Sequence, residues 1–179
     1  MNVITLCPCC EQRLRSTYGP RVTPKTSSIS KTIEAVICYA AEDPSLTSRL
    51  ASECEKLSKK FRLSEKRVWS IKVQAYAKTG QWKALRTLGD SRAKSPIGFK
   101  PFALAVIRGK QPVNDSMRYI ERITQPEERY YLFCEAKLWK KALDEAMQLR
   151  DPARIMNVRS LCNDAELQQL CERLVLQMD

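Results

Sequence analysis

The residues of this sequence that could do chemistry are few, and the densest group is Cys7-Pro8-Cys9-Cys10. Cys7 and Cys10 have the spacing of one half of a zinc knuckle. A closed structural zinc site needs four ligands, usually from two such pairs, and the sequence has no second Cys-x-x-Cys and no histidine. We therefore predict no metal and no cofactor, and interpret the cluster as exposed, oxidisable thiols in a flexible tail. The other cysteines stand alone in helical segments, where a thiol behaves as a small apolar side chain: Cys38, Cys54, Cys134, Cys162 and Cys171.

Catalytic motifs are missing from the sequence as well. The absence of histidine removes the commonest general base. There is no glycine-rich phosphate loop and no GxSxG or HExxH motif. The adjacent carboxylates Glu127-Glu128 and Asp144-Glu145 would diverge by about 100° on a helix, so neither pair aims at one substrate. We predict that the chain is not an enzyme.

The net charge of +11 is concentrated in the middle of the chain. Residues 49–100 hold fourteen Lys or Arg against four Asp or Glu, whereas residues 101–179 hold twelve of each. A basic region can bind an acidic protein, an anionic membrane surface or nucleic acid. Nucleic acid is not expected, because the aromatic residues occupy helical core positions, with Trp69 as the partial exception. No apolar run approaches the roughly 18 residues of a membrane span, and no signal-peptide core is present, so we expect a cytoplasmic protein.

The elements that would position these residues are short helices. Glycine is scarce, and long stretches are rich in Ala, Leu, Glu, Lys, Arg and Gln, which favours an all-α chain. Residues 1–30 differ, because they contain prolines and a Ser/Thr run without a helical period. We predict an extended or disordered lead-in over residues 1–30 and a helical domain over residues 31–179.

Start and stop signals divide residues 31–179 into short helices. Ser64 is a suitable N-cap for a helix that ends at Thr79-Gly80, where glycine can adopt the left-handed conformation. Asn163, with Glu166 three residues later, resembles a capping box. Prolines mark three further helix starts: Pro112, Pro126 and Pro152.

A repeat is visible between two tryptophan-containing segments. Residues 80–85, GQWKAL, are similar to residues 138–143, LWKKAL, and Gly80, Gly109 and Leu138 are each 29 residues apart. A period near 30 that contains two short helices is typical of an α-solenoid. The apolar stripe on each helix needs a stacked neighbour to bury it. The predicted fold is therefore all-α: an α-solenoid of stacked short helical hairpins with an extended N-terminal lead-in.

A firm break in the helical pattern lies at residues 94–102, KSPIGFKPF. Gly98 relaxes the backbone there, and Pro101 can start the next helix without losing a needed donor. The apolar residues around the break would pin it against neighbouring helices. We interpret the break as a structural corner between repeats rather than a binding site, formed by Ser95, Pro96, Ile97, Gly98, Phe99, Pro101 and Phe102.

Three motifs together resemble the C-terminal domain of vacuolar protein sorting-associated protein 16. They are the basic-aromatic segment Ser64-Glu65-Lys66-Arg67-Val68-Trp69-Ser70-Ile71-Lys72, then Gly80-Gln81-Trp82, then the break at residues 94–102. The resemblance covers roughly residues 30–179, and a paralogous branch, the spermatogenesis-defective protein 39 type, has a similar break. It implies a non-enzymatic scaffold subunit of the HOPS or CORVET tethering complexes, peripheral on endosome or vacuole/lysosome membranes.

The resemblance also implies a partner. This is vacuolar protein sorting-associated protein 33, a Sec1/Munc18 protein that templates SNARE assembly before membrane fusion. Other HOPS/CORVET subunits and an indirect association with SNAREs and membranes follow from the same likeness. The family's contact arginine matches Arg67, with Lys66 and Trp69 as its neighbours on the helix. We expect the basic charge of residues 49–100 to complement an acidic patch on this partner.

The chain departs from the family pattern in two respects. The full-length family subunit has an N-terminal β-propeller and a longer solenoid, and residues 1–30 do not match the family's helices, which fits a fragment, a short isoform or a reduced subunit. Two alternatives stay open beside the tethering role. One is an unrelated α-solenoid adaptor, and the other is a basic helical-repeat RNA binder.

Overall fold

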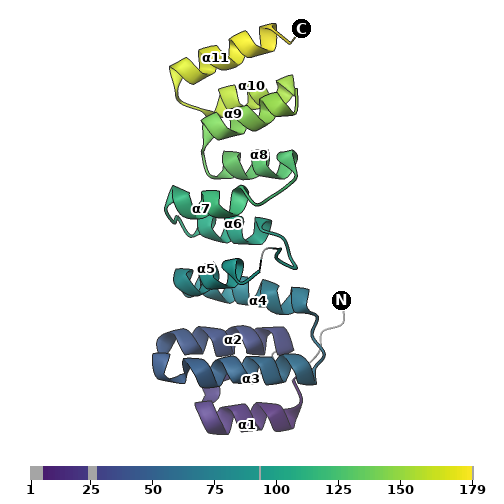
Figure 1. Cartoon of the computed structure of the whole chain (residues 1–179). Helices are drawn as coiled ribbons and strands as arrows, with labels where there is room; N and C mark the ends of the chain where they lie inside the picture. Colours follow the sequence, from purple (N-terminus) through teal and green to yellow (C-terminus); the bar gives the residue numbers. More distant parts are fainter. Residues whose placement is uncertain (1–5, 24–27, 93, 179) are drawn as a thin grey trace. The chain divides into compact units, whose positions relative to one another are not determined.

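The computed structural model describes residues 6–23, 28–92 and 94–178, and within these ranges the regular structure is helical (Figure 1). The predicted all-α class, with short helices stacked as in a solenoid, is confirmed. The chain divides into two compact units, which we call unit 1 (Met1–Ile97) and unit 2 (Gly98–Asp179). Within the described ranges, no helix is both long enough and apolar enough to traverse a bilayer.

Unit 1 is organised around α2. This helix packs against both α3 and α4, and α5 folds back onto α4. Residues far apart in the sequence, such as Leu14, Ile33 and Leu57, are buried together in one apolar cluster. The described elements of unit 1 are α1 (Pro8–Tyr18), η1 (Pro20–Val22), α2 (Ile29–Glu42), η2 (Pro44–Leu46), α3 (Thr47–Lys60), α4 (Glu65–Lys78) and α5 (Trp82–Asp90).

The described part of the N-terminal lead-in is helical, not extended as predicted. Pro8 lies in the first turn of α1, where its missing N–H costs no hydrogen bond. Leu6, Leu14 and Val22 are all buried in the cluster of unit 1. The prediction failed because the prolines at positions 8 and 20 flank the helix instead of interrupting it. The part of the predicted lead-in that covers residues 1–5 and 24–27 lies outside the described residues.

Unit 2 consists of consecutive helices that pack on their neighbours. The closest pairings are α6 with α7, α8 with α9, and α10 with both α9 and α11. An aromatic group begins this unit, with ring centroids 6.0 Å apart for Phe99 and Phe102 and 5.3 Å apart for Phe102 and Tyr119. The helices are α6 (Lys100–Arg108), α7 (Val113–Ile120), α8 (Pro126–Glu135), α9 (Trp139–Gln148), α10 (Pro152–Leu161) and α11 (Ala165–Leu176).

Most helix starts follow the local signals of the sequence. The Arg67 N–H donates to the Ser64 Oγ at 3.4 Å, as expected of an N-cap, and α8 and α10 begin at their prolines. The start of α11 differs, because its cap is Asp164 and not Asn163. Asp164 Oδ1 accepts hydrogen bonds from the N–H groups of Glu166 and Leu167 at 3.0 and 3.2 Å. The Asp164 carboxylate, one residue after Asn163, thus satisfies two of the free N–H groups of the first turn.

The predicted corner contains the turn that its residues suggest. The Ile97 N–H donates to the Ser95 Oγ at 3.3 Å, and Gly98 has a φ of +70°. Pro101 lies in the first turn of α6. Phe99 and Phe102 are buried, whereas Ser95, Pro96 and Ile97 are only half-buried. A purely structural role for the whole set remains a prediction.

Five helices end in the same backbone geometry. The second residue after α3, α4, α6, α8 and α9 has a positive φ, and the N–H of the following residue donates to the carbonyl five residues before it. Only Gly80 was predicted to act in this way. At the end of α6 the left-handed residue is Lys110, not Gly109, so the period is near 30 without being constant. The left-handed residues are Arg62, Gly80, Lys110, Lys137 and Arg150.

Candidate partner-binding surface

The predicted contact residues lie at the start of α4, which Ser64 caps. Arg67 is half-buried, and its Nε donates to the Ser30 Oγ on α2 at 2.9 Å. The Ser64 hydroxyl therefore caps α4, and the Ser30 hydroxyl holds the Arg67 side chain against α2. Arg67 thus has a role in positioning α4 inside unit 1, in addition to any contact with a partner.

The structure separates the three predicted residues by exposure. Lys66 is exposed, Arg67 is half-buried, and Trp69 retains only 7% of its surface. A side chain that is 7% exposed contributes to the interior of its unit, so Trp69 supports the shape of α4 rather than offering a surface. Lys66 is the member of the three that a partner can reach directly. Partner binding by these residues stays a prediction.

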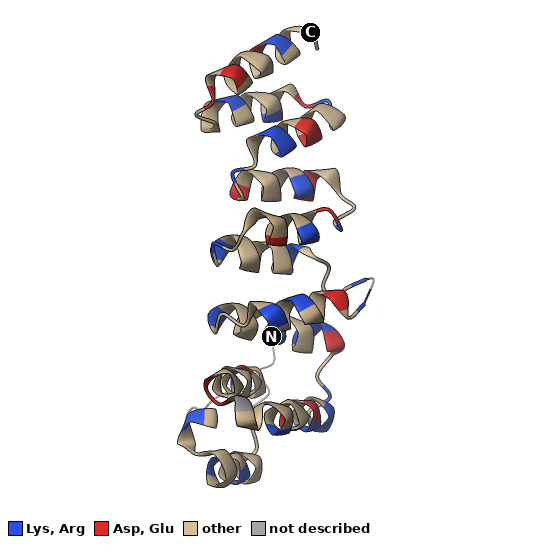
Figure 2. Cartoon of the chain, turned by 60° about the vertical axis from the view of Figure 1, so that its left-hand side comes forward, with Lys and Arg blue, Asp and Glu red and all other residues tan. Residues whose placement is uncertain are grey.

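Lys and Arg positions are distributed along the helices of unit 1 (Figure 2). Some are neutralised locally, as in the pair Arg92–Glu65 at 2.6 Å. Others are exposed and form no ion pair with any residue in the described part of the chain, which leaves their charge available to a partner. They include Arg49, Lys59, Arg62, Lys66, Lys83 and Lys94.

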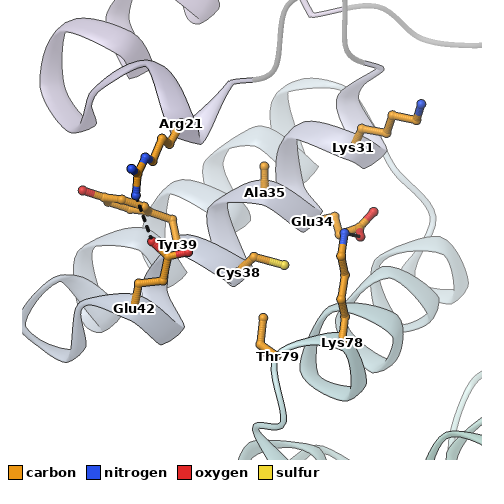
Figure 3. Close-up of a pocket in the computed structure, with 9 residues that line it drawn as sticks. All are labelled: Arg21, Lys31, Glu34, Ala35, Cys38, Tyr39, Glu42, Lys78 and Thr79. Atoms are coloured by element: carbon orange, nitrogen blue, oxygen red, sulfur yellow. Dashed lines mark hydrogen bonds and ion pairs between the residues drawn. The ribbon is translucent and has the colours of Figure 1, made fainter. Parts of the chain in front are cut away.

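A hollow of about 490 Å³ lies beside α2 and was not foreseen from the sequence (Figure 3). Lys78 at the end of α4 pairs with Glu34 at 3.0 Å, and Arg21 lies 3.8 Å from Glu42. The hydrogen bond to Glu34 raises the pKa of the Lys78 ammonium, and burial raises the pKa of the Cys38 thiol. Since Glu34 and Glu42 are both paired and the raised pKa keeps the Cys38 thiol protonated, the hollow offers a surface for binding rather than reacting groups.

The sequence did contain a signal for this hollow. Glu34, Cys38 and Glu42 are spaced four residues apart, which places them on one face of α2. Their cationic partners come from η1 and α4, and only the packing of unit 1 brings those elements beside α2. A helical wheel of α2 shows the acidic face, but it does not show that Arg21 and Lys78 lie opposite that face.

The adjacent carboxylates Glu127-Glu128 and Asp144-Glu145 do not act together on one group. Glu128 bonds Lys100 at 3.1 Å, and Glu145 bonds Arg129 at 2.7 Å. Glu127 and Asp144 are exposed. Glu128 and Glu145 therefore each belong to a structural ion pair between helices.

Relatives of this chain are found in an insect, an amoeba and a plant, and two of the three have the same name. A vacuolar protein sorting-associated protein 16 homolog of Drosophila melanogaster is 24% identical over 128 residues, which cover 69% of this chain. The homolog of the same name in Dictyostelium discoideum is 22% identical over 133 residues, or 74% of this chain. Protein VACUOLELESS1 of Arabidopsis thaliana is 28% identical over 101 residues, or 56% of this chain.

The match is confined to one part of those relatives. The aligned region amounts to 15%, 16% and 12% of their respective lengths. No solved structure matches this chain. The sequence profile of the family described as Vps16, C-terminal region, matches residues 46–177, which include α4 and every described helix of unit 2. This match spans well over half of the sequence, so the chain belongs to the family defined by the C-terminal region of Vps16.

Proposed function

We propose that this chain acts as a non-enzymatic scaffold subunit of an endosome or vacuole tethering complex of the HOPS/CORVET type. The observation that carries the proposal is the family match over residues 46–177. The names of two relatives refer to vacuolar protein sorting, which is a membrane-trafficking process. Stacked helices with exposed faces suit a scaffold, because each helix pair can present a surface while its neighbours maintain the core.

The proposed partner is vacuolar protein sorting-associated protein 33, the Sec1/Munc18 protein that would link the complex to SNARE-mediated fusion. The proposed contact is the start of α4, where Lys66 is exposed and Arg67 is half-buried. Basic side chains of unit 1 that have no ion pair among the described residues, including Arg62 and Lys83, would meet an acidic surface of the partner. Such a subunit would be cytoplasmic and peripheral on endosome or vacuole/lysosome membranes, through the complex rather than through a span of its own.

The test is co-expression with the Sec1/Munc18 protein of the same organism, followed by size-exclusion chromatography and a titration of affinity. The wild-type chain should co-elute with the partner. Lys66→Glu reverses an exposed charge and should weaken binding about tenfold, which corresponds to about 1.4 kcal/mol. Lys140→Glu is the matched control, since Lys140 is an exposed lysine on α9 of unit 2 and its reversal should leave the affinity unchanged.

Arg67 requires its own control, because its side chain also bonds Ser30. Arg67→Glu should weaken binding at least as much as Lys66→Glu. Ser30→Ala removes the internal hydrogen bond without changing charge, and it should leave binding within about twofold of wild type. Equal losses in Arg67→Glu and Ser30→Ala would assign Arg67 to the fold of unit 1 and remove it from the contact.

Ionic strength separates an electrostatic contact from an apolar one. If the basic surface of unit 1 meets an acidic partner, the affinity should fall as salt rises, because exposed charges are screened over about 8 Å at physiological ionic strength. A wild-type chain that elutes alone while folded would overturn the proposed partner. Salt-sensitive binding of random RNA without binding of the Sec1/Munc18 protein would favour an RNA-binding function instead.

A further inference from the structure

The thiols of Cys7, Cys9 and Cys10 converge at the N-terminus of α1. Cys7 is the N-cap of this helix, and Cys10 lies in its first turn. The three Sγ atoms all lie within 4.8 Å of one another, and the Cys7 and Cys9 sulfurs are 3.1 Å apart. The cluster therefore brings three soft donor atoms to one point, in a segment that the sequence suggested was a flexible tail.

The spacing of these sulfurs suits a metal ion. Zinc binds thiolates at about 2.3 Å, so two sulfurs of a tetrahedral site lie about 3.8 Å apart. The observed separations, 3.1 Å for one pair and no more than 4.8 Å for the others, are close to that distance. Small side-chain rotations therefore suffice to place all three sulfurs around one ion, and the exposed Cys9 is free to make them.

The electrostatic surroundings favour an anionic complex at this point. Lys60, at the end of α3, has its Nζ 2.9 Å from the Cys10 Sγ and 3.9 Å from the Cys7 Sγ. Three thiolates around a divalent cation carry a net charge of minus one. The Lys60 ammonium and the positive end of the α1 dipole both complement that charge. The nearby carboxylate Glu11 is paired with Arg15 at 2.9 Å, so it does not compete as a counter-ion for Lys60.

The position of the cluster is also fixed by packing. The Arg13 Nη2 donates to the Glu53 Oε2 at 2.6 Å, which ties α1 to α3 one turn away from the thiols. Cys10 and Leu14 are buried in the apolar cluster of unit 1. A site on a helix that is packed in this way loses less conformational entropy on binding an ion than a site in a free tail.

We propose that Cys7, Cys9 and Cys10 form a three-thiolate site for zinc or a similar thiophilic divalent cation. The fourth position of the tetrahedron would be taken by water or by a ligand from outside the chain. Binding releases the protons of those thiols that are still protonated. The sequence prediction of no metal rested on counting Cys-x-x-Cys pairs, and it left out Cys9, which adjoins Cys10 and was not expected to converge with Cys7. This site is independent of the proposed tethering function.

The test uses Co²⁺ as a spectroscopic probe on the reduced, metal-free chain. Wild type should bind one Co²⁺ per chain with sulfur-to-cobalt charge-transfer absorption of three-thiolate intensity, and Zn²⁺ should displace it. Cys9→Ser should weaken Co²⁺ binding more than tenfold, and since Cys9 is exposed, this change should leave the helical circular dichroism intact. Cys38→Ser and Cys134→Ser, which alter half-buried thiols elsewhere, are the matched controls and should bind as wild type does.

Two results would overturn the proposal. One is a wild-type chain that is folded and reduced but gives no charge-transfer absorption with Co²⁺. The other is unchanged Co²⁺ binding in folded Cys9→Ser. A chain that binds no Co²⁺ but loses two hydrogens on treatment with glutathione disulfide, with the new disulfide mapped to the Cys7–Cys10 segment by peptide mass analysis, would identify a redox pair instead. Because the titration needs no partner protein, its outcome is separate from the co-elution experiment.

Discussion

Each unit contains an arginine–glutamate pair that joins two helices, and the two pairs differ in how they are enclosed. In unit 1, Arg13 on α1 bonds Glu53 on α3 at 2.6 Å. In unit 2, Arg129 on α8 donates two hydrogen bonds to Glu145 on α9, at 2.7 and 2.8 Å. The glutamate side chains are similarly buried, at 6% and 10% exposure. The arginines are not alike, because Arg13 is 50% exposed and Arg129 only 20%.

The two ion pairs also differ in the other groups that contact them. Arg129 also donates to the carbonyls of Ile123 and Thr124 at 3.0 and 3.2 Å, so its guanidinium is held from two sides. Glu53 instead has a second cation, because Lys56 lies 3.1 Å from its other oxygen. Removing one partner of a buried ion pair is strongly destabilising when no other group compensates the charge that is left. Loss of Arg129 should therefore leave Glu145 uncompensated, whereas after loss of Arg13 the Glu53 carboxylate still has Lys56.

The units also differ in net charge. Unit 1 holds eighteen Lys or Arg against eight Asp or Glu, and unit 2 holds thirteen against twelve. Extra cations near a buried carboxylate help to satisfy it, which is how Lys56 supports Glu53. The same excess leaves basic side chains exposed on unit 1 for the proposed acidic partner. Unit 2 has no comparable excess, so its ion pairs serve packing within the unit.

The largest effect is expected from Arg129→Leu. It leaves the buried Glu145 carboxylate without its cation, and the free energy of unfolding should fall by about 3 kcal/mol. Urea denaturation followed by circular dichroism measures the change. The double variant Arg129→Leu with Glu145→Leu removes both charges and should regain most of the loss. If the double variant is no more stable than the single one, lost packing and not an unpaired charge is the cause.

A smaller effect is expected from Arg13→Leu in unit 1. Lys56 still pairs with Glu53, and the Arg13 side chain is already half in water, so the loss should be about 1 kcal/mol. The same urea titration gives the value. A loss equal to that of Arg129→Leu would remove the contrast between the units, since it would mean that Lys56 does not compensate.

Acidification should weaken unit 1 through Glu53. The hydrogen bond from Arg13, followed by that from Lys56, lowers the pKa of the Glu53 carboxyl below its ordinary value. A lowered folded-state pKa stabilises the fold above the unfolded pKa of about 4.3, and the stabilisation disappears as pH falls through the folded pKa. The stability difference between wild type and Glu53→Gln should therefore be constant from pH 7 to about 5.5 and shrink below that. A difference that grows on acidification would contradict this assignment.

The smallest effect is expected from Lys56→Ala. Lys56 is largely exposed and three residues from Glu53, so its removal should cost about 0.3 kcal/mol while Arg13 is present. In the Arg13→Leu background the same change should cost more, because Glu53 then loses its last cation. A double-mutant cycle measures this coupling, and simple additivity would show that the two cations act independently.

The sequence was sufficient for features that depend on neighbours within one helical turn. Ser64 and Pro126 predicted helix starts, and Gly80 predicted a left-handed helix end. It was insufficient for contacts between helices. The hydrogen bond from Arg67 to Ser30 spans 37 residues of sequence, and only the packing of α4 on α2 creates it. The burial of Trp69 and the role of Arg67 inside unit 1 follow from that packing as well.

The helix ends of left-handed geometry have a consequence for how this family can vary. Four of the five left-handed residues are Lys or Arg, at a strain of roughly 1 kcal/mol each relative to glycine. The bonds that close these ends join main-chain groups that every residue but proline possesses. The end of a helix is therefore not tied to one side chain, and substitutions can accumulate there without altering where the next helix begins. Relatives that share 22% to 28% of their aligned residues with this chain can keep the same succession of helices for this reason.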